Sequence, residues 1–221
     1  MGRKIIAMSL YGNAPQYTLG AVANAKLMPL VYPDWTLRIY YNTLKGIPEI
    51  AQLKELGCEL VPQRPSRGQA GMFWRFLAAW GANTERVIFR DSDSRINHKE
   101  AAAVQAWEAL GHDAHCMHDH MHHRSHPLFG GMWGVKFGVL PRELRREALR
   151  LGRQRQPRVA DMRWLARKVL PKIKKSLLRH SSIPVRWPSV PFPDHAPMEG
   201  FIGQQYDEFN QPIDPLKSAG V

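Results

Sequence analysis

The sequence has few cysteines, fewer acidic than basic residues, and no long hydrophobic run. Cys58 and Cys116 are its two cysteines among 221 residues, and they are far apart without the spacing of metal ligands. A disulfide framework or a zinc-cysteine site is therefore not expected, and we predict two buried, reduced thiols. Nowhere do about 18 apolar residues run together, the length that a membrane-spanning helix requires. The apolar stretch after Arg3-Lys4 is too short for a signal peptide. We expect a cytoplasmic chain, at most peripheral at the inner face of the membrane.

The shortage of acidic residues is confined to one segment. The chain has 31 lysines and arginines against 19 acidic residues, a net charge of +12. Residues 136–180 hold 15 lysines and arginines and 3 acidic residues, which accounts for the whole excess. Such a segment attracts polyanions, namely nucleic acid, an anionic membrane or phosphorylated substrates. The alternative is a pair of solvated helical faces.

Apolar runs alternate with helix-like segments through the first half of the chain, which is typical of βα units. We predict an α/β fold with a mostly parallel central sheet flanked by helices, in a single domain over residues 1–221. The expected strands are Lys4–Leu10, Thr36–Tyr41, Cys58–Val61, Arg86–Phe89, Ala114–Met117 and Gly130–Val135. The expected helices are Tyr17–Met28, Ile47–Leu56, Gly71–Trp80 and Lys99–Leu110.

The second half is expected to hold a basic helical segment at 136–180, with helices at Arg142–Leu151 and Ala160–Val169. Five prolines between 184 and 197 exclude regular helix there, so residues 181–197 are predicted to form an extended tail. A last strand at Phe201–Tyr206 is expected to close the fold.

The most informative stretch is the apolar run Val87–Phe89 followed by Asp91-Ser92-Asp93. Open α/β sheets bind ligands where their strands end, and alternate residues of an extended chain share a side. Asp91 and Asp93 can therefore converge on one cation, and hard oxygen ligands suit Mg²⁺ or Mn²⁺. Such a cation would bridge the phosphates of a diphosphate and stabilise the charge on a departing nucleoside diphosphate.

Short acidic pairs are also common in solvated turns, so other interpretations stay open. A phosphatase could use Asp91 as its nucleophile, but Arg90, Arg95 and the mid-chain position argue against that motif. A nucleic-acid-binding protein or metal-dependent nuclease could combine the Asp pair with the basic segment. That alternative lacks a nucleic-acid motif and aromatic residues interleaved with the basic run.

The order of motifs around the Asp pair resembles the GT-A glycosyltransferases. It is most similar to small bacterial and viral glycosyltransferase-like proteins distantly related to glycosyltransferase family 8. The likeness begins with Lys4–Gly12 and Tyr32-Pro33-Asp34-Trp35, and continues through Gly71–Leu77 and Gly130–Gly134. It implies a nucleotide-sugar donor, and it places Tyr11 of the first βα unit near the nucleoside.

The resemblance also assigns roles to single residues. Arg75 lies where family 8 carries a basic residue that reaches the donor, and a guanidinium also suits pairing with Asp91. Gly130 and Gly131 would let the backbone approach a sugar ring. Asp161 lies at the place of an Asp-Gln pair, although Met162 replaces the Gln.

Two further candidates come from the same resemblance. Asp119 is expected near the reacting sugar, alongside Asp161. His180 lies where the family has a histidine that completes the metal site, although Ser181-Ser182 departs from the usual continuation. Retention of the anomeric configuration is what the family 8 likeness favours.

Seven histidines crowd residues 112–126, which raises the possibility of a zinc or nickel site. They scatter over a strand and a loop instead of following fixed ligand offsets, so we interpret most of them as surface residues near the substrate cleft.

We therefore expect a divalent-metal-dependent enzyme that moves a sugar from a nucleotide-diphosphate donor to a hydroxyl acceptor, as in surface glycan synthesis. The metal ligands would be Asp91, Asp93 and His180. The basic segment is best explained by docking to anionic lipid that presents a lipid-linked acceptor, and nucleic acid is not the expected partner.

Overall fold

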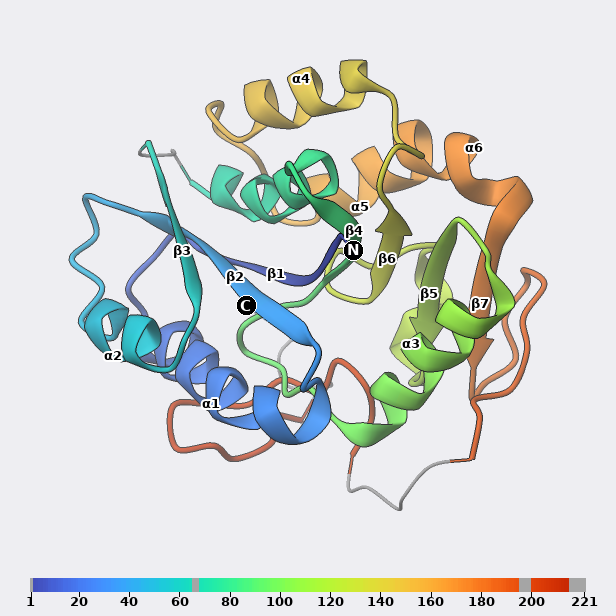
Figure 1. The fold of residues 1–221 in the computed structure, drawn as a ribbon, viewed down its shortest axis with the longest axis horizontal. Coiled ribbons are helices and arrows are strands. Elements are labelled where there is room, and N and C mark those ends of the chain that lie inside the picture. The colour runs from blue at the N-terminus through green and yellow to red at the C-terminus, as the bar shows by residue number, and fades with distance from the viewer. Residues whose placement is uncertain (1, 65–67, 195–199, 215–221) are drawn as a thin grey trace.

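The protein is an α/β fold built on one seven-stranded sheet, in a computed structural model that describes residues 2–64, 68–194 and 200–214. The strand order is β3-β2-β1-β4-β6-β5-β7 (Figure 1). All neighbouring strands pair in parallel except β6, which is antiparallel to both β4 and β5. The strands are β1 (Arg3–Leu10), β2 (Trp35–Asn42), β3 (Glu59–Gln63), β4 (Thr84–Phe89), β5 (Ala114–His118), β6 (Trp133–Lys136) and β7 (Leu177–Ser181). The predicted fold class is confirmed.

The helices lie on both faces of the sheet and bury its two sets of alternating side chains. Ile6 and Met8 of β1 pack with α1 (Pro15–Val31), α2 (Ile50–Glu55) and α3 (His98–Leu110). Ile5 and Ala7 face the opposite layer. That layer consists of the 3₁₀ helix η1 (Ala70–Trp80), α4 (Arg142–Leu151), α5 (Ala160–Trp164), the π-helical η3 (Leu165–Val169) and α6 (Leu170–Ile173). The short 3₁₀ helices η2 (Met121–Ser125) and η4 (Lys174–Ser176) complete the described elements.

Local sequence signals fix the helices that follow β1 and β4. Pro15 lies in the first turn of α1. A backbone N–H at that position has no partner within the helix, so proline loses no hydrogen bond there. Asn97 caps α3 by accepting a hydrogen bond from the backbone N of Glu100, and Gly111 ends α3 in the left-handed conformation. α1 therefore begins shortly after the carboxyl end of β1, and α3 begins shortly after the carboxyl end of β4.

Three expectations about elements differ from the structure. Gly71–Trp80 is helical as predicted, but it belongs to a 3₁₀ helix that begins at Ala70. The basic segment 136–180 is not helical to its end, because Leu177–Ser181 forms β7 and bonds to β5. The predicted strand Phe201–Tyr206 is wrong: this stretch forms no strand, and its β-pairing is limited to two isolated bridges, Ser94 with Gln205 and Tyr206 with Pro212.

Part of the predicted proline-rich tail lies along the sheet edge. Val190 bonds to the backbone on either side of His180 in β7, and Arg179 donates to the carbonyl of Pro188. Residues 195–199 fall outside the described residues. Cys58 and Cys116 are both buried and free, as predicted. Among the described residues, no helix is long and apolar enough to cross a membrane.

Candidate active site

The candidate site is a cavity of about 550 Å³ at the carboxyl ends of β1 and β4. These strands pair in parallel, so Tyr11 after β1 and the Asp motif after β4 reach the same edge of the sheet. η1 and the start of α5 form further walls. The polar residues that line the cavity are Tyr11, Tyr17, Gln69, Arg75, Asp91, Asp93, His122, His123, Arg158, Asp161 and Gln205.

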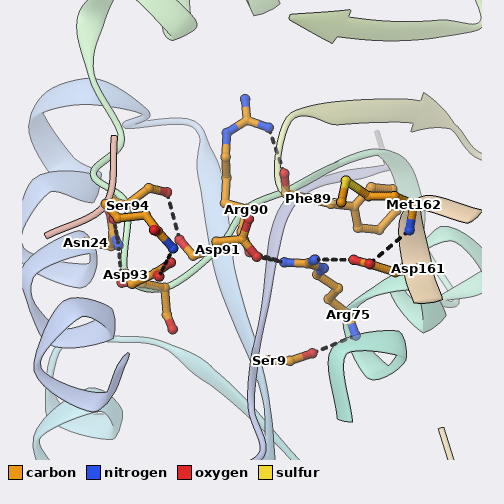
Figure 2. Close-up of polar contacts among 12 residues, drawn as sticks. Ser9, Asn24, Arg75, Phe89, Arg90, Asp91, Asp93, Ser94, Asp161 and Met162 are labelled. Carbon is orange, nitrogen blue, oxygen red and sulfur yellow. Dashed lines mark hydrogen bonds and ion pairs between the residues drawn. The ribbon is translucent and has the colours of Figure 1, made fainter. Parts of the chain in front are cut away.

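Arg75 joins two parts of this cavity (Figure 2). Its Nη1 pairs with Oδ1 of Asp91 and donates to the carbonyl of Arg90 at 3.1 Å. Its Nη2 pairs with Oδ2 of Asp161 at 3.1 Å. Burial alone lowers the pKa of Arg75, but the two carboxylates outweigh it and raise that pKa. Arg75 therefore stays charged and fixes both aspartates.

Asp91 and Asp93 differ in exposure. The Asp91 side chain is 51% exposed, whereas Asp93 is only 2% exposed. Gln205 donates to Oδ2 of Asp93 at 2.7 Å. Burial, together with the neighbouring charge of Asp91, raises the pKa of Asp93 to about 6. A cation between these carboxylates would offset that repulsion.

The loop that carries the two aspartates is held by Asn24 of α1. Its side-chain amide donates to the carbonyls of Ser92 and Ser94, and its Oδ1 accepts from the backbone N of Ile96 (Figure 2). Asn24 is fully buried. The Asn24 side chain therefore provides hydrogen-bond partners for three backbone groups of this loop.

Gly130 and Gly131 pack directly on the charged residues. A Cβ at Gly130 would overlap the carboxylate of Asp161 and Nη2 of Arg75. A Cβ at Gly131 would overlap the carboxylate of Asp91 and lie 2.9 Å from the backbone N of that residue. Both positions therefore require glycine, because a larger side chain would collide with an aspartate. The sequence alone did not reveal this requirement.

Two more groups at the cavity have shifted pKa values. Burial raises the pKa of Tyr11 to about 12, so its hydroxyl stays protonated at neutral pH. Burial also raises the pKa of Asp161, although Arg75 opposes that shift. Met162 likewise lines the cavity, and its backbone N donates to Oδ1 of Asp161.

His180 does not join the two aspartates. It lies on β7, three strands away from β4 in the sheet order, and is not among the residues that line the cavity. Its Nδ1 lies 2.8 Å from Nε2 of the buried His115. Within the described part of the chain, no group of three or more His, Cys, Asp or Glu side chains is placed to hold a metal ion. The three-ligand set expected from sequence is therefore not assembled.

Asp119 also lies apart from the cavity. Lys99 pairs with its Oδ1 at 2.6 Å, the hydroxyl of Ser182 donates to the same atom, and the backbone N of Ile202 donates to Oδ2 at 2.8 Å. Its side chain is 2% exposed. These contacts tie the loop after β5 to the chain near Ile202, which is a structural role.

The histidine-rich stretch divides between core and surface. His115 and His118 are buried on β5, and His123 accepts from the backbone N of Asp119 at 3.0 Å. Burial lowers the pKa of His123 to about 3, so this ring is neutral at physiological pH. His122 and His123 line the cavity.

Other candidates considered from sequence have local roles. Arg90 points away from Arg75 and donates to the carbonyl of Phe89 (Figure 2), and it also pairs with the buried Glu100 at 3.0 Å. Arg95 bonds to Asn210 and lies over the ring of Tyr206. Trp133 is fully buried against Phe89, so it is a core residue.

Sequence reasoning missed Gln205 and Asn24 as parts of the site. Gln205 was assigned to a closing strand, and nothing in its sequence context marks a contact with Asp93. Asn24 carried a usable signal, because a polar residue on the buried face of a helix requires partners.

No protein-family model matches the chain, and no curated protein sequence matches it. Several solved structures share its fold. A cytidylyltransferase from Leptospira borgpetersenii serovar Hardjo-bovis superposes with a TM-score of 0.51 at 10% identity, over 83% of this chain and 77% of that chain. A glycosyltransferase involved in glycosylation of the major capsid of PBCV-1 gives 0.48 at 14% identity, over 81% of both chains. A mannosyltransferase from Pyrobaculum calidifontis, solved with GDP-Man and Mn²⁺, gives 0.49 at 15% identity, over 71% of this chain and 55% of that chain. The chain thus shares its overall fold with the cytidylyltransferase, and it is structurally similar, at lower scores, to the two glycosyltransferases.

Proposed function

We propose that the chain is a divalent-metal-dependent glycosyltransferase that uses a nucleotide-diphosphate sugar. The observation that carries the proposal is the arrangement of Asp91, Asp93 and the Arg75–Asp161 pair around one cavity at the carboxyl edge of the sheet. A fold shared with transferases that act on nucleotides agrees with this assignment.

The donor set fits a hard divalent cation. Mg²⁺ and Mn²⁺ are commonly held by one or two carboxylates, with substrate phosphates and water as the other ligands. Asp91 and Asp93 supply two such carboxylates at the cavity, and the raised pKa of Asp93 reflects carboxylate repulsion as well as burial. When bound, the cation supplies charge that neutralises a diphosphate leaving group. His180 is not part of this proposal.

Arg75 and Asp161 orient the rest of the site. In the proposed complex, Arg75 holds Asp91 in place through Nη1 and keeps Asp161 ionised through Nη2. The Asp161 carboxylate can then accept hydrogen bonds from the hydroxyls of a bound sugar. The two glycines bring the chain before β6 close to both aspartates. Positioning and electrostatic stabilisation are expected to supply most of the rate.

The phosphatase and nuclease hypotheses have less support. Arg75 engages Oδ1 of Asp91, so Oδ2 alone would have to act both as the nucleophile of a phosphatase and as a ligand of its cation. The nuclease hypothesis lacks a nucleic-acid motif in the sequence. Asp119 already binds three groups of the protein, so Asp161 is the carboxylate that we propose to face the sugar.

A thermal-shift screen tests the proposal. Purified chain is heated with UDP-, GDP- and ADP-sugars, with a CMP-sugar as the control that lacks a diphosphate, and with the free nucleotides CTP and UTP, each with and without Mn²⁺. We expect Mn²⁺-dependent stabilisation by one nucleotide-sugar class, lost in Asp93→Asn. Stabilisation by CTP or UTP alone would indicate nucleotidyl transfer instead, and no response to any ligand would overturn the proposal.

A further inference from the structure

The helical layer that contains α4 and α6 has a strongly cationic outer surface. The apolar side chains of this layer, such as Leu144, Trp164 and Ile173, pack against the sheet and η1. The opposite side carries the charge: all 13 lysines and arginines between Arg142 and Lys175 are exposed. We call this set, together with Phe137, the basic surface. Its helices lie together along one side of the molecule, away from α1 and α2 (Figure 1).

Little of this charge is neutralised within the protein. Over Arg142–Lys175 there are three acidic residues, and the Asp161 side chain is turned inward to Arg75. Among the described residues, the ion pairs recorded on the basic surface are Arg146 with Glu143 at 3.1 Å and Arg150 with Glu147 at 3.9 Å. A field of one sign over so many helical turns attracts a polyanion.

An aromatic side chain stands among these cations. Phe137, at the end of β6, is 53% exposed. A concavity of about 450 Å³ joins Phe137 and Trp80 to α4 residues that include Arg142, Arg145 and Arg146. Exposed apolar rings beside arginines suit the boundary between lipid headgroups and acyl chains, where the ring is buried and the guanidinium meets phosphate.

We propose that the basic surface docks on an anionic phospholipid membrane, with the Phe137–Arg142–Arg145 concavity as its insertion point. Nucleic acid is less well matched, because binding to single strands uses rows of aromatic rings along a cationic groove. Phe137 is the sole exposed large aromatic residue recorded between 137 and 175 in the described chain.

The basic surface is continuous with the rim of the cavity. Arg158 lies between α4 and α5, is exposed, and lines the cavity. If the proposed glycosyltransferase function is correct, docking through this surface brings an acceptor at the lipid headgroup level close to that rim. The docking itself does not depend on the reaction.

Vesicle flotation tests the docking with the full chain. Vesicles of phosphatidylcholine alone and of phosphatidylcholine with 30 mol% phosphatidylglycerol are compared at low and high salt, at about 0.05 and 0.5 M. We expect flotation with the anionic vesicles at low salt and its loss at high salt. Arg142→Glu/Arg145→Glu should weaken partitioning at least tenfold, since each cation contributes roughly fivefold. Phe137→Ser should weaken it several-fold without changing the salt dependence.

The matched control is Lys26→Glu/Lys54→Glu, which makes the same change in charge at exposed positions of α1 and α2 on the other face of the sheet. It should float like the wild type. Absence of flotation, equal flotation with neutral vesicles, or equal loss in the control would overturn the proposal. Tighter binding to an RNA oligonucleotide than to anionic vesicles at the same salt would assign the surface to nucleic acid. Mn²⁺-dependent donor binding by the Arg142→Glu/Arg145→Glu variant should be unchanged, which separates this inference from the proposed function.

Discussion

Arg75 makes its side-chain hydrogen bonds inside the protein and is 4% exposed. Replacing it with methionine would keep the volume of the side chain but leave the buried Asp161 without its counter-charge. We expect Arg75→Met to lower the free energy of unfolding by about 3 kcal/mol, as for other broken buried ion pairs. Urea denaturation measures this change.

A double-mutant cycle separates the ion pair from packing. Asp161→Leu in the Arg75→Met background removes the uncompensated carboxylate, so the double variant should be more stable than Arg75→Met alone. Strict additivity of the two single changes would contradict a direct Arg75–Asp161 coupling.

Asp93 should make the stability of the metal-free protein depend on pH. Its pKa rises from 3.8 to about 6 on folding. Between these values the folded state holds a proton that the unfolded state has released, so this residue's contribution to stability is full below pH 4 and falls as the pH rises through 6. The loss approaches about 3 kcal/mol, from 1.36 kcal/mol per pKa unit.

The comparison of wild type with Asp93→Asn isolates that contribution. The difference in unfolding free energy between the two should shift in favour of Asn as the pH goes from 4 to 7, and Mn²⁺ should restore part of the wild-type stability. A difference that is flat over this range would mean that Asp93 titrates normally.

At the scale of elements, the α1 helix holds the Asp loop mainly through Asn24. Asn24→Ala would leave the buried backbone N–H of Ile96 without its partner, whereas the carbonyls of Ser92 and Ser94 would still accept from Arg95. Since an orphaned buried group costs about 1–3 kcal/mol, we expect a destabilisation of that size. Hydrogen exchange of the Ile96 amide should increase as well, and unchanged protection there would contradict the assigned role.

The turn before β6 is the second element that shapes the site. Gly131→Ala places a methyl group against the Asp91 carboxylate, so that carboxylate must move away from Arg75. We expect Mn²⁺-dependent nucleotide binding to fall at least tenfold, measured by calorimetry. Gly12→Ala is the control, because a Cβ at Gly12 meets open space. Equal losses of nucleotide binding in the two variants would show that the steric clash at Gly131 does not cause the loss.

Element patterns in the sequence predicted the first half of the fold well and the second half less well. Apolar runs located β1 to β5, because β1, β2, β4 and β5 are largely buried and the edge strand β3 follows the turn at Gly57. β7 was missed because its sequence, Leu-Leu-Arg-His-Ser, continues a basic helical pattern, and its pairing with β5 is a tertiary contact. The strand prediction for Phe201–Tyr206 was wrong because this stretch is held by the contacts of Ile202 with Asp119 and of Gln205 with Asp93, and not by a ladder of strand hydrogen bonds.

The same contrast holds for the site. Asp91 and Arg75 could be predicted as site residues because each belongs to a recognisable motif. The sheet topology then brings their side chains together. Asp119 and His180 were predicted from the same resemblance, but neither lines the cavity. Such a side chain can face a cavity or bind a partner such as Lys99 or His115. Which of the two happens depends on tertiary packing, and a local sequence pattern does not reveal it.

At the scale of the whole molecule, charge is unevenly distributed. The cavity concentrates carboxylates around Arg75, whereas the outer helical layer carries almost unbroken positive charge. An acidic pocket attracts a divalent cation, and the bound cation then makes the same pocket attractive to a diphosphate. The central claim is that these groups activate a nucleotide sugar.

The most direct test follows the phosphorus-containing products by ³¹P NMR. The chain is incubated with Mg²⁺ and the nucleotide sugar that stabilises it best, with water or a simple glycoside as acceptor. The account predicts slow, metal-dependent release of the nucleoside diphosphate, abolished in Asp93→Asn and strongly reduced in Arg75→Lys. Release of a nucleoside monophosphate or pyrophosphate, or turnover that persists in Asp93→Asn, would contradict it.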